Sequence, residues 1–229
     1  MNGIRKSTYN ILAMVTALMS LLIVSACEHN FYETGDSELS YLHTDFVEAR
    51  TDEMSAFVSA VTDEGRQLIL KPVVKELWAT KADTTYRALL YYNKVEKGVT
   101  SSFVINPVVV LRPRLENSSS SSYNDPIGFE SVWMSKNRKY LNLTLIVKTG
   151  KTEDKKAVQS LAVIRDSIKS LSSGRRIVYL RLMHHQNKVP EYYSRRVFTS
   201  IPLNEFRQND SICLDMNTYK GKISKHFVY

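Results

Sequence analysis

The amino-acid sequence predicts an all-β protein with two antiparallel β domains, and three observations support this. From residue 39 onward the chain falls into short segments rich in β-branched and aromatic residues, separated by turn-forming residues. Apart from the segment 153–173, the sequence shows no helical pattern long enough for the crossovers that connect parallel strands. The apolar residues Leu141, Leu143, Leu145 and Val147 occupy every second position, as expected of a strand with one buried face.

The first half holds six candidate strands. Turn-like sequences separate them, because Gly accepts positive φ and Pro fixes φ. These turns are Asp63-Glu64-Gly65, Lys71-Pro72, Glu96-Lys97-Gly98 and Asn106-Pro107. The predicted strands are 39–48, 54–62, 67–70, 84–92, 102–105 and 108–111.

A serine run, Ser118–Ser122, interrupts the strand pattern at mid-chain. No core can be built from it, so residues 118–127 are predicted to be a linker between a first domain at 41–117 and a second at 128–229. The second half holds six further predicted strands, at 129–134, 140–148, 175–184, 192–201, 211–216 and 223–228.

The segment 153–173 is ambiguous. Its apolar residues from Val158 to Leu171 fit a helical period, which slightly favours a helix. The run Leu161-Ala162-Val163-Ile164 within it is equally typical of a strand.

The N-terminus has the three parts of a bacterial lipoprotein signal peptide. Arg5 and Lys6 precede an apolar stretch, Ile11–Val24, that as a helix would rise only about 21 Å, less than a bilayer core of about 30 Å. Val24-Ser25-Ala26-Cys27 matches a lipobox, which predicts cleavage after residue 26, lipid on Cys27 and a polar tether over 27–40. A disulfide with Cys213, a metal site and ordinary secretion are the less favoured alternatives, and Cys213 itself is expected to be a small core residue.

Charge is distributed unequally along the chain, whose formal net charge is +8. Residues 27–127 contain 10 Lys and Arg against 15 Asp and Glu, or −5, whereas residues 128–229 contain 19 against 8, or +11. A basic surface attracts anionic lipids or glycans, although an ordinary solvated face explains it equally well. Export makes nucleic acid an unexpected partner.

Catalytic and metal-binding motifs are weak in this sequence. His184, His185 and Glu191 come closest to a metal cluster, but adjacent histidines on a strand point to opposite faces. The chain lacks a Gly-x-Ser-x-Gly nucleophile motif and a glycine-rich phosphate loop. We therefore expect no catalytic residues, metal or other cofactor.

The segment Tyr192-Tyr193-Ser194-Arg195-Arg196 is the candidate ligand-binding site. In a strand, Tyr193 and Arg195 share one face while Tyr192 and Arg196 share the other. Aromatic rings beside guanidinium groups suit sugars or anionic groups. The alternative, to which we give more weight, is that one face packs in the core and the other is a solvated stripe.

Several stretches resemble the NigD-like family of Bacteroidetes lipoproteins. They include Tyr86–Lys94, Lys139–Leu143, Val189–Ser194 and Asn217–Gly221. The resemblance implies an N-terminal OB-like barrel, a C-terminal antiparallel β-sandwich and an outer-membrane address, and it makes 158–166 a strand followed by a turn. It supplies no catalytic set, and its name comes from a bacteriocin-associated operon.

These observations predict a lipid-anchored cell-envelope protein that acts as a non-catalytic binding or interaction module. The resemblance adds the expectation of a bacteriocin-related role. Its expected partners are the membrane, through the lipid on Cys27, and an envelope protein or anionic glycan. The alternative is an envelope glycan hydrolase whose two carboxylates the sequence does not locate.

Overall fold

The computed structural model describes residues 41–115 and 123–229, and within these ranges the protein contains no α-helix. The same ranges include no helix with the length and apolar character needed to cross a bilayer. The predicted signal peptide, Cys27, the tether and the serine run of the linker lie outside the described residues. The expected all-β class is confirmed.

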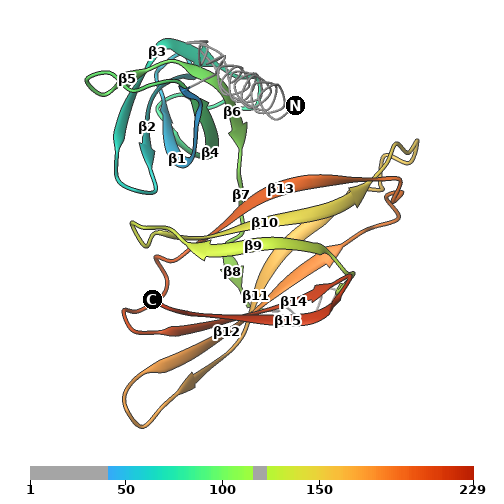
Figure 1. Ribbon diagram of the computed structural model, residues 1–229. Helices are drawn as coiled ribbons and strands as arrows, with labels where there is room; N and C mark the ends of the chain where they lie inside the picture. Colours follow the sequence, from blue (N-terminus) through green and yellow to red (C-terminus); the bar gives the residue numbers. More distant parts are fainter. Residues whose placement is uncertain (1–40, 116–122) are drawn as a thin grey trace, which may run out of the picture. The chain divides into compact units, whose positions relative to one another are not determined.

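Six strands form one strongly curved sheet, hereafter the curled sheet (Figure 1). Its strand order is β5-β3-β2-β1-β4-β6. Alternate residues of these strands point to the concave side, where Val47, Phe57, Leu68, Leu90 and other apolar side chains form a core. The strands are β1 (His43–Thr51), β2 (Ala56–Thr62), β3 (Gln67–Lys75), β4 (Thr85–Tyr92), β5 (Val99–Thr100) and β6 (Ser102–Pro107).

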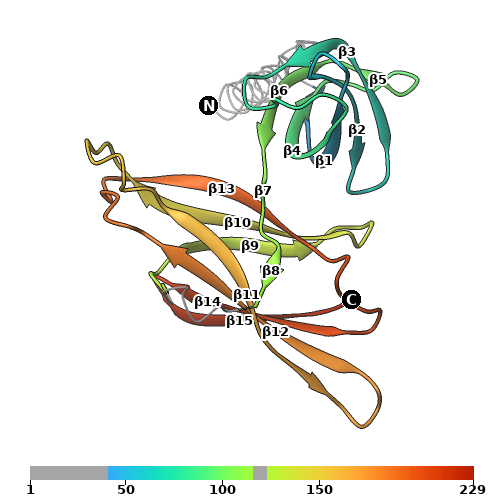
Figure 2. The same ribbon diagram turned by 180° about the vertical axis from the view of Figure 1, so that it is seen from behind.

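Two further sheets face each other and form the sandwich (Figure 2). Their orders are β7-β13-β10-β9 and β15-β14-β12-β11-β8. Apolar residues from both sheets fill the space between them, including Leu143, Leu180 and Leu214. The strands are β7 (Val109–Val110), β8 (Pro113–Arg114), β9 (Gly128–Met134), β10 (Tyr140–Thr149), β11 (Ser160–Ser170), β12 (Arg176–His185), β13 (Tyr193–Pro202), β14 (Ser211–Thr218) and β15 (Gly221–Val228).

The helical reading of residues 158–171 is wrong. Residues 160–170 form β11, which pairs along its length with β12. The strand also continues past the turn expected after residue 166, with an irregularity between Arg165 and Ser167. Such an irregularity adds a residue to one strand, which disturbs the alternation that the sequence shows.

Two predicted turns lie inside strands. Lys71-Pro72 belongs to β3, where Phe57 of β2 pairs with Val74 while Ser59 pairs with Ile69. The four residues between Ile69 and Val74 thus oppose a single residue of β2, so β3 accommodates the proline in a bulge. Asn106-Pro107 ends β6, which is an edge strand. Proline has no N–H to donate, and on the outer side of an edge strand there is no neighbouring strand to accept one.

Strands β7 and β8 connect the two parts of the fold. The sequence assigns them to the first half, yet β7 pairs with β13 and β8 with β11, both in the sandwich. Both pairings are parallel, as is that of β12 with β14. The parallel pairing of β12 with β14 follows from chain order. After β12 the chain crosses to the opposite sheet as β13, which returns it to the end of the sandwich at which β12 began.

Strand β10 is buried on both faces over its first half. Leu141, Leu143 and Leu145 face the sandwich core, as the alternation predicted. Asn142 and Thr144, on the opposite face, are also buried, at 0% and 4% exposure. Hydrogen bonds join Asn142 to Asp63 and Arg87, so the curled sheet covers the second face.

Candidate functional site

The four residues predicted to bind ligand all lie at the sandwich surface. Tyr193, Arg195 and Arg196 belong to β13, whereas Tyr192 precedes it. Tyr192 is 81% exposed and Tyr193 is 55% exposed, and both arginines are exposed as well. None of the four is part of the core, contrary to the alternative in which one face of the segment packs there.

The structure brings Tyr193 and Arg195 to one face and separates them from Arg196. Their cross-strand partners are Thr149 and Val147, which share a face of β10. Arg196 lies on the other face, where its Nε donates a 2.7 Å hydrogen bond to Glu130. This bond raises the pKa of Arg196 and keeps its guanidinium engaged.

Two residues that the sequence reading did not select lie near the tyrosines. Lys148 Nζ lies 4.3 Å from the centre of the Tyr219 ring and 3.2 Å from Glu191 Oε2. The Tyr219 hydroxyl donates a long 3.4 Å hydrogen bond to the same Glu191 oxygen. Burial and the Glu191 carboxylate raise the pKa of Tyr219, which keeps its hydroxyl protonated.

We call the end of the sandwich that holds Lys148, Tyr192, Tyr193 and Tyr219 the tyrosine-rich end. Tyr193 pairs with Thr149 at the end of β10, whereas Tyr219 lies against Lys148, which faces the opposite side of β10. Tyr219 is 41% exposed, so all three tyrosine rings are accessible to solvent. Tyr192 and Pro190 approach the backbone of Gly150 closely, since a Cβ on Gly150 would lie 2.7 Å from the Tyr192 ring.

The two adjacent histidines point to different surroundings. His184 is buried, and its Nδ1 lies 3.1 Å from the carbonyl oxygen of Pro126. His185 stacks on Tyr123, with ring centres 3.4 Å apart. In the described ranges, no three His, Cys, Asp or Glu side chains are arranged to hold a metal ion.

Cys213 lies in β14 with 5% exposure, in the small core role expected of it. Burial and the neighbouring Asp215 carboxylate raise the pKa of its thiol. A thiol in this state is mostly protonated and unreactive at neutral pH.

A buried polar network joins the curled sheet to the sandwich, and Arg87 of β4 is its centre. The guanidinium donates two 2.7 Å hydrogen bonds to the two oxygens of Asp63. It also donates to Ser200 of β13 at 3.1 Å and to Asn142 of β10 at 2.9 Å. The Tyr140 ring covers its face, 4.0 Å from the guanidinium carbon.

A second junction lies beside this network. Glu48 of β1 accepts a 2.9 Å hydrogen bond from the Tyr140 hydroxyl and a 2.7 Å bond from Lys139 Nζ. Burial acts to raise the pKa of Glu48, but these two hydrogen bonds outweigh it and hold the pKa below its usual value. Burial and the Glu48 carboxylate raise the pKa of Tyr140 to about 12.

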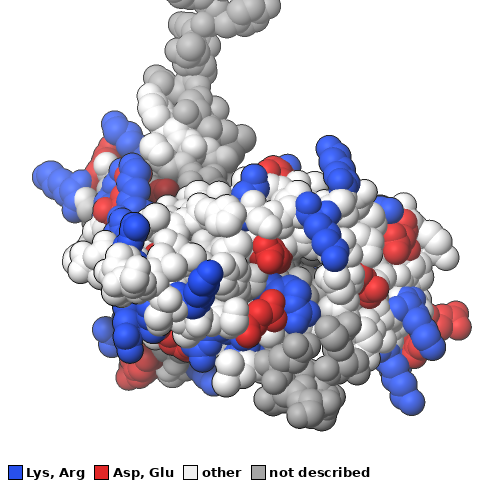
Figure 3. Space-filling view, turned by 90° about the horizontal axis from the view of Figure 1, so that it is seen from below, with Lys and Arg blue, Asp and Glu red and all other residues white. Residues whose placement is uncertain are grey.

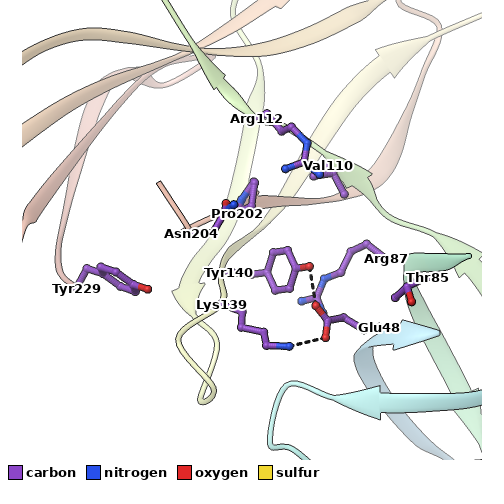
Figure 4. Close-up of a pocket in the computed structure, with 10 residues that line it drawn as sticks. All are labelled: Glu48, Thr85, Arg87, Val110, Arg112, Lys139, Tyr140, Pro202, Asn204 and Tyr229. Carbon is purple, nitrogen blue, oxygen red and sulfur yellow. Dashed lines mark hydrogen bonds and ion pairs between the residues drawn. The ribbon is translucent and has the colours of Figure 1, made fainter. Parts of the chain in front are cut away.

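An open cavity of about 410 Å³ lies against these residues, and we call it the inter-sheet groove (Figure 4). Its walls come from β1 and β4 of the curled sheet and from β10 and the C-terminal part of the sandwich. Arg112, in the segment between β7 and β8, enters it from the side opposite Glu48 in this view. The lining residues with polar or aromatic groups include Glu48, Arg87, Arg112, Lys139, Tyr140 and Tyr229.

The groove and the tyrosine-rich end lie at opposite ends of one strand pair. Tyr140 pairs with Pro202 at the groove, and Thr149 pairs with Tyr193 at the other end. Nine residues of extended strand separate them, or about 30 Å. A single small ligand therefore does not contact both.

The groove is not predicted from the sequence, although two features of the sequence indicate buried polar side chains near it. Arg87 stands immediately before the apolar run Ala88-Leu89-Leu90 within a predicted strand, and Asn142 interrupts the leucines of β10. Charged and amide side chains on strands with such apolar neighbours are buried only when they are paired. Which residues pair with them depends on contacts between distant parts of the chain.

The excess of basic residues in the second half does not form one uniform patch. Figure 3 shows a face on which Lys and Arg lie among Asp and Glu. Ion pairs join Arg165 to Glu205, Arg176 to Asp210 and Arg196 to Glu130. Local pairing thus offsets part of the positive charge, as on an ordinary solvated surface.

A family model described as the NigD-like C-terminal beta sandwich domain matches residues 108–229. This range is more than half of the chain, and it begins where the sandwich strands begin. The chain belongs to the NigD-like family. The match starts before the predicted linker and includes β7 and β8, consistent with their pairing in the sandwich sheets of this NigD-like protein.

Solved structures of similar fold include proteins from Bacteroides and Parabacteroides species. A NigD-like immunity protein from Bacteroides caccae has a TM-score of 0.64 and 20% identity, covering 81% of this chain and 96% of its own. A candidate toxin-related protein from Parabacteroides distasonis has a TM-score of 0.60 and 13% identity, covering 82% and 93%. A candidate lipoprotein from Bacteroides fragilis has a TM-score of 0.55 and 14% identity, covering 81% and 96%. These likenesses show the fold of the NigD-like chain, and no curated protein matches it.

Proposed function

We propose that this NigD-like protein is a lipid-anchored, non-catalytic binding module of the cell envelope, which binds an anionic glycan at its tyrosine-rich end. The lipobox at Cys27 supports the anchor, and the fold likeness to a candidate lipoprotein agrees with it. The outer membrane is the proposed address.

The observation that carries the binding proposal is the exposure of Tyr192, Tyr193 and Tyr219 beside cations. Single exposed aromatic rings are common on proteins, but three at one end of the sandwich are not explained by packing. Aromatic faces stack on the apolar faces of sugar rings, and the exposed Arg195, on the same face as Tyr193, can bind carboxylate, sulfate or phosphate groups.

The contacts of the nearby carboxylates favour binding over hydrolysis. A glycosidase needs two carboxyl groups on either side of the bond, one of them protonated. Glu191 is paired with Lys148 at the tyrosine-rich end, and Glu48 at the groove is held ionised. Each of these two carboxylates is thus bound to a lysine, Glu191 to Lys148 and Glu48 to Lys139.

Binding is tested by measuring the affinity of the purified protein for acidic oligosaccharides and for the same sugars with their carboxylates reduced to alcohols. Tyr193→Ala and Arg195→Ala should each weaken binding of the acidic sugars about tenfold or more, since charged hydrogen bonds and ring contacts are lost. Tyr41→Ala, which removes a ring 47% exposed in the first half, is the matched control.

Three results would contradict this proposal. They are absence of binding to every acidic sugar, equal loss in Tyr41→Ala, or equal affinity for the reduced sugars. Steady release of new reducing ends would favour the hydrolase instead. Binding to a purified envelope protein that depends on Tyr193, without glycan binding, would assign the same surface to a protein partner.

The anchor is tested separately by fractionating cells that express the native chain or Cys27→Ala. The native protein should be in the outer membrane and the variant in the soluble fraction. A variant that remains embedded would mean that the N-terminal segment itself is the anchor. Protease treatment of intact cells then assigns the native protein to the outer surface or to the periplasm.

A bacteriocin-related role is a second candidate, because a relative of similar fold is a NigD-like immunity protein and another is a candidate toxin-related protein. If the chain confers immunity, its deletion should sensitise the cell to a toxin from a sister strain. Restoration of resistance by the native chain but not by Tyr193→Ala would place toxin recognition at the tyrosine-rich end.

A further inference from the structure

Among the described residues that line the inter-sheet groove, one positively charged side chain has no ion-pair partner within 41–115 and 123–229. Arg87 is matched by Asp63, and Lys139 is matched by Glu48. Arg112 is exposed and lines the groove, and within the described ranges it has no hydrogen bond or ion pair. A guanidinium with free donors in a recess is suited to a carboxylate, which accepts two parallel hydrogen bonds from its fork.

The shape of the groove suits a small ligand. Its volume of about 410 Å³ lies within the range of roughly 300–1,000 Å³ that is typical of small-molecule sites. The rings of Tyr140 and Tyr229 provide apolar surface on its walls, as Figure 4 shows. Asn204 and Thr85 add neutral polar groups that can fix the orientation of a bound molecule.

The wall formed by Tyr140 is held in place by contacts on two sides. The Tyr140 ring is held between the Arg87 guanidinium and its own hydrogen bond to Glu48. Arg87 is in turn held by four hydrogen bonds to Asp63, Ser200 and Asn142. A wall fixed in this way loses little conformational entropy when a ligand binds.

We propose that the inter-sheet groove is a second binding site, separate from the tyrosine-rich end, for a small ligand whose carboxylate pairs with Arg112 and whose body packs on Tyr140. Sugar acids and the free C-termini of short peptides both carry this chemistry. Because such a ligand binds the folded chain and not the unfolded one, its binding stabilises the folded protein.

The proposal is tested with four probes on the purified chain: glucuronate, glucose, a trialanine peptide with a free C-terminus, and the same peptide with its C-terminus amidated. Affinity is measured by calorimetric titration, and the unfolding temperature Tm is followed against probe concentration. At least one carboxylate probe should bind and raise Tm, and its neutral counterpart should do neither. The probe that binds identifies the source as a sugar acid or a peptide terminus.

Arg112→Gln should weaken binding about tenfold or more, because a charge-assisted pair is lost. Arg112→Lys should bind with intermediate affinity, since a point charge replaces the bidentate fork. Arg114→Gln is the matched control, as Arg114 is an exposed arginine two residues away that does not line the groove. Because Arg112 has no partner within the described ranges, its substitution should leave the Tm of the unliganded protein unchanged.

Several outcomes would overturn the groove as this site. The proposal fails if neither carboxylate probe binds. It also fails if the neutral probes bind as tightly as the carboxylate probes. Equal weakening by Arg112→Gln and Arg114→Gln would indicate a non-specific charge effect. Loss of binding in Tyr193→Ala but not in Arg112→Gln would place the carboxylate site at the tyrosine-rich end. That result would contradict the groove site but would leave the proposed glycan binding intact, so the two proposals can fail separately.

Discussion

Single residues decide how the two parts of the fold meet, and Glu48 is one whose contribution depends on pH. Its side chain is 22% exposed and accepts hydrogen bonds from Lys139 and Tyr140 of the sandwich. These bonds favour the ionised carboxylate and hold its pKa below the ordinary value of 4.5, although burial opposes them. Glu48 therefore stabilises the folded state when it is charged.

This arrangement predicts how stability changes with pH. A depressed folded-state pKa contributes stability that is present above the unfolded value, near 4.5, and is lost as pH falls through the lower folded value. The free energy of unfolding of the native chain should therefore decrease below about pH 4.5, and Glu48→Gln should show a smaller decrease in that range. Urea titrations at a series of pH values measure both.

Glu53→Gln, in the turn after β1, is the control for this measurement. It should follow the pH dependence of the native chain more closely than Glu48→Gln does. An identical pH dependence in the native chain and Glu48→Gln would show that the contacts of Glu48 with Lys139 and Tyr140 do not stabilise the fold.

The sequence allowed the surface residues to be predicted better than the buried polar ones. Tyr193 and Arg195 were placed on one face from strand periodicity alone, and the structure puts them there. Arg87 and Asn142 could not be assigned a role, because their partners lie 24 to 113 residues away. Periodicity describes neighbours along a strand, whereas pairing of a buried charge depends on how distant strands meet.

At the scale of elements, strand positions were predictable and strand partners were not. Most predicted strands agree with the structure to within a few residues, because alternation and turn residues are local signals. Strand β11 was ambiguous, since its irregularity near Asp166 disturbs the alternation. The two-residue strands β7 and β8 carry too few residues for any period, so only their pairing shows where they belong.

Strand β9 supplies a prediction about close packing between strands. Gly128 pairs with Ile146 of β10, and a Cβ on Gly128 would lie 2.7 Å from the Ile146 Cβ and 2.9 Å from its carbonyl oxygen. Paired Cβ atoms are normally about 4.5–5.5 Å apart. Gly128→Ala should therefore lower the free energy of unfolding by roughly 1–3 kcal/mol, as overpacking does, measured by urea denaturation.

Ser131→Ala, which changes another residue of β9, is the matched control, and it pairs opposite Thr144 without such a close approach. We expect it to alter stability by less than about 0.5 kcal/mol. If Gly128→Ala is as stable as the native chain, β9 must be free to shift away from β10, and the glycine is not required by the packing.

At the scale of the whole described region, the sandwich and the curled sheet share an interface that is both aromatic and polar. Phe46 of β1 makes edge-to-face contacts with Trp133 of β9 and Phe198 of β13, at centre distances of 5.4 and 5.9 Å. The Arg87 network lies beside this cluster, with its guanidinium 5.3 Å from the Phe46 ring. Apolar packing and a satisfied buried charge together explain why 41–229 forms one compact unit.

Arg87 should consequently control whether the two parts unfold together. Its side chain is 2% exposed and that of Asp63 is 14% exposed, so Arg87→Met leaves a carboxylate in a largely dry place. Breaking a buried pair in this way costs about 3–5 kcal/mol. In differential scanning calorimetry the native chain should unfold in one transition, whereas Arg87→Met should unfold at lower temperature and in two transitions, as the sandwich and the curled sheet lose their coupling.

The double variant Arg87→Met with Asp63→Asn separates a network effect from simple damage. It leaves no unpaired charge, so it should be more stable than Arg87→Met alone, and the two substitutions should be strongly non-additive. Arg50→Met, which changes an exposed arginine of β1, should keep the single transition of the native chain. If the double variant is destabilised by the sum of the two single effects, Arg87 and Asp63 act independently, and coupling between the sheets must come from the aromatic contacts of Phe46 instead.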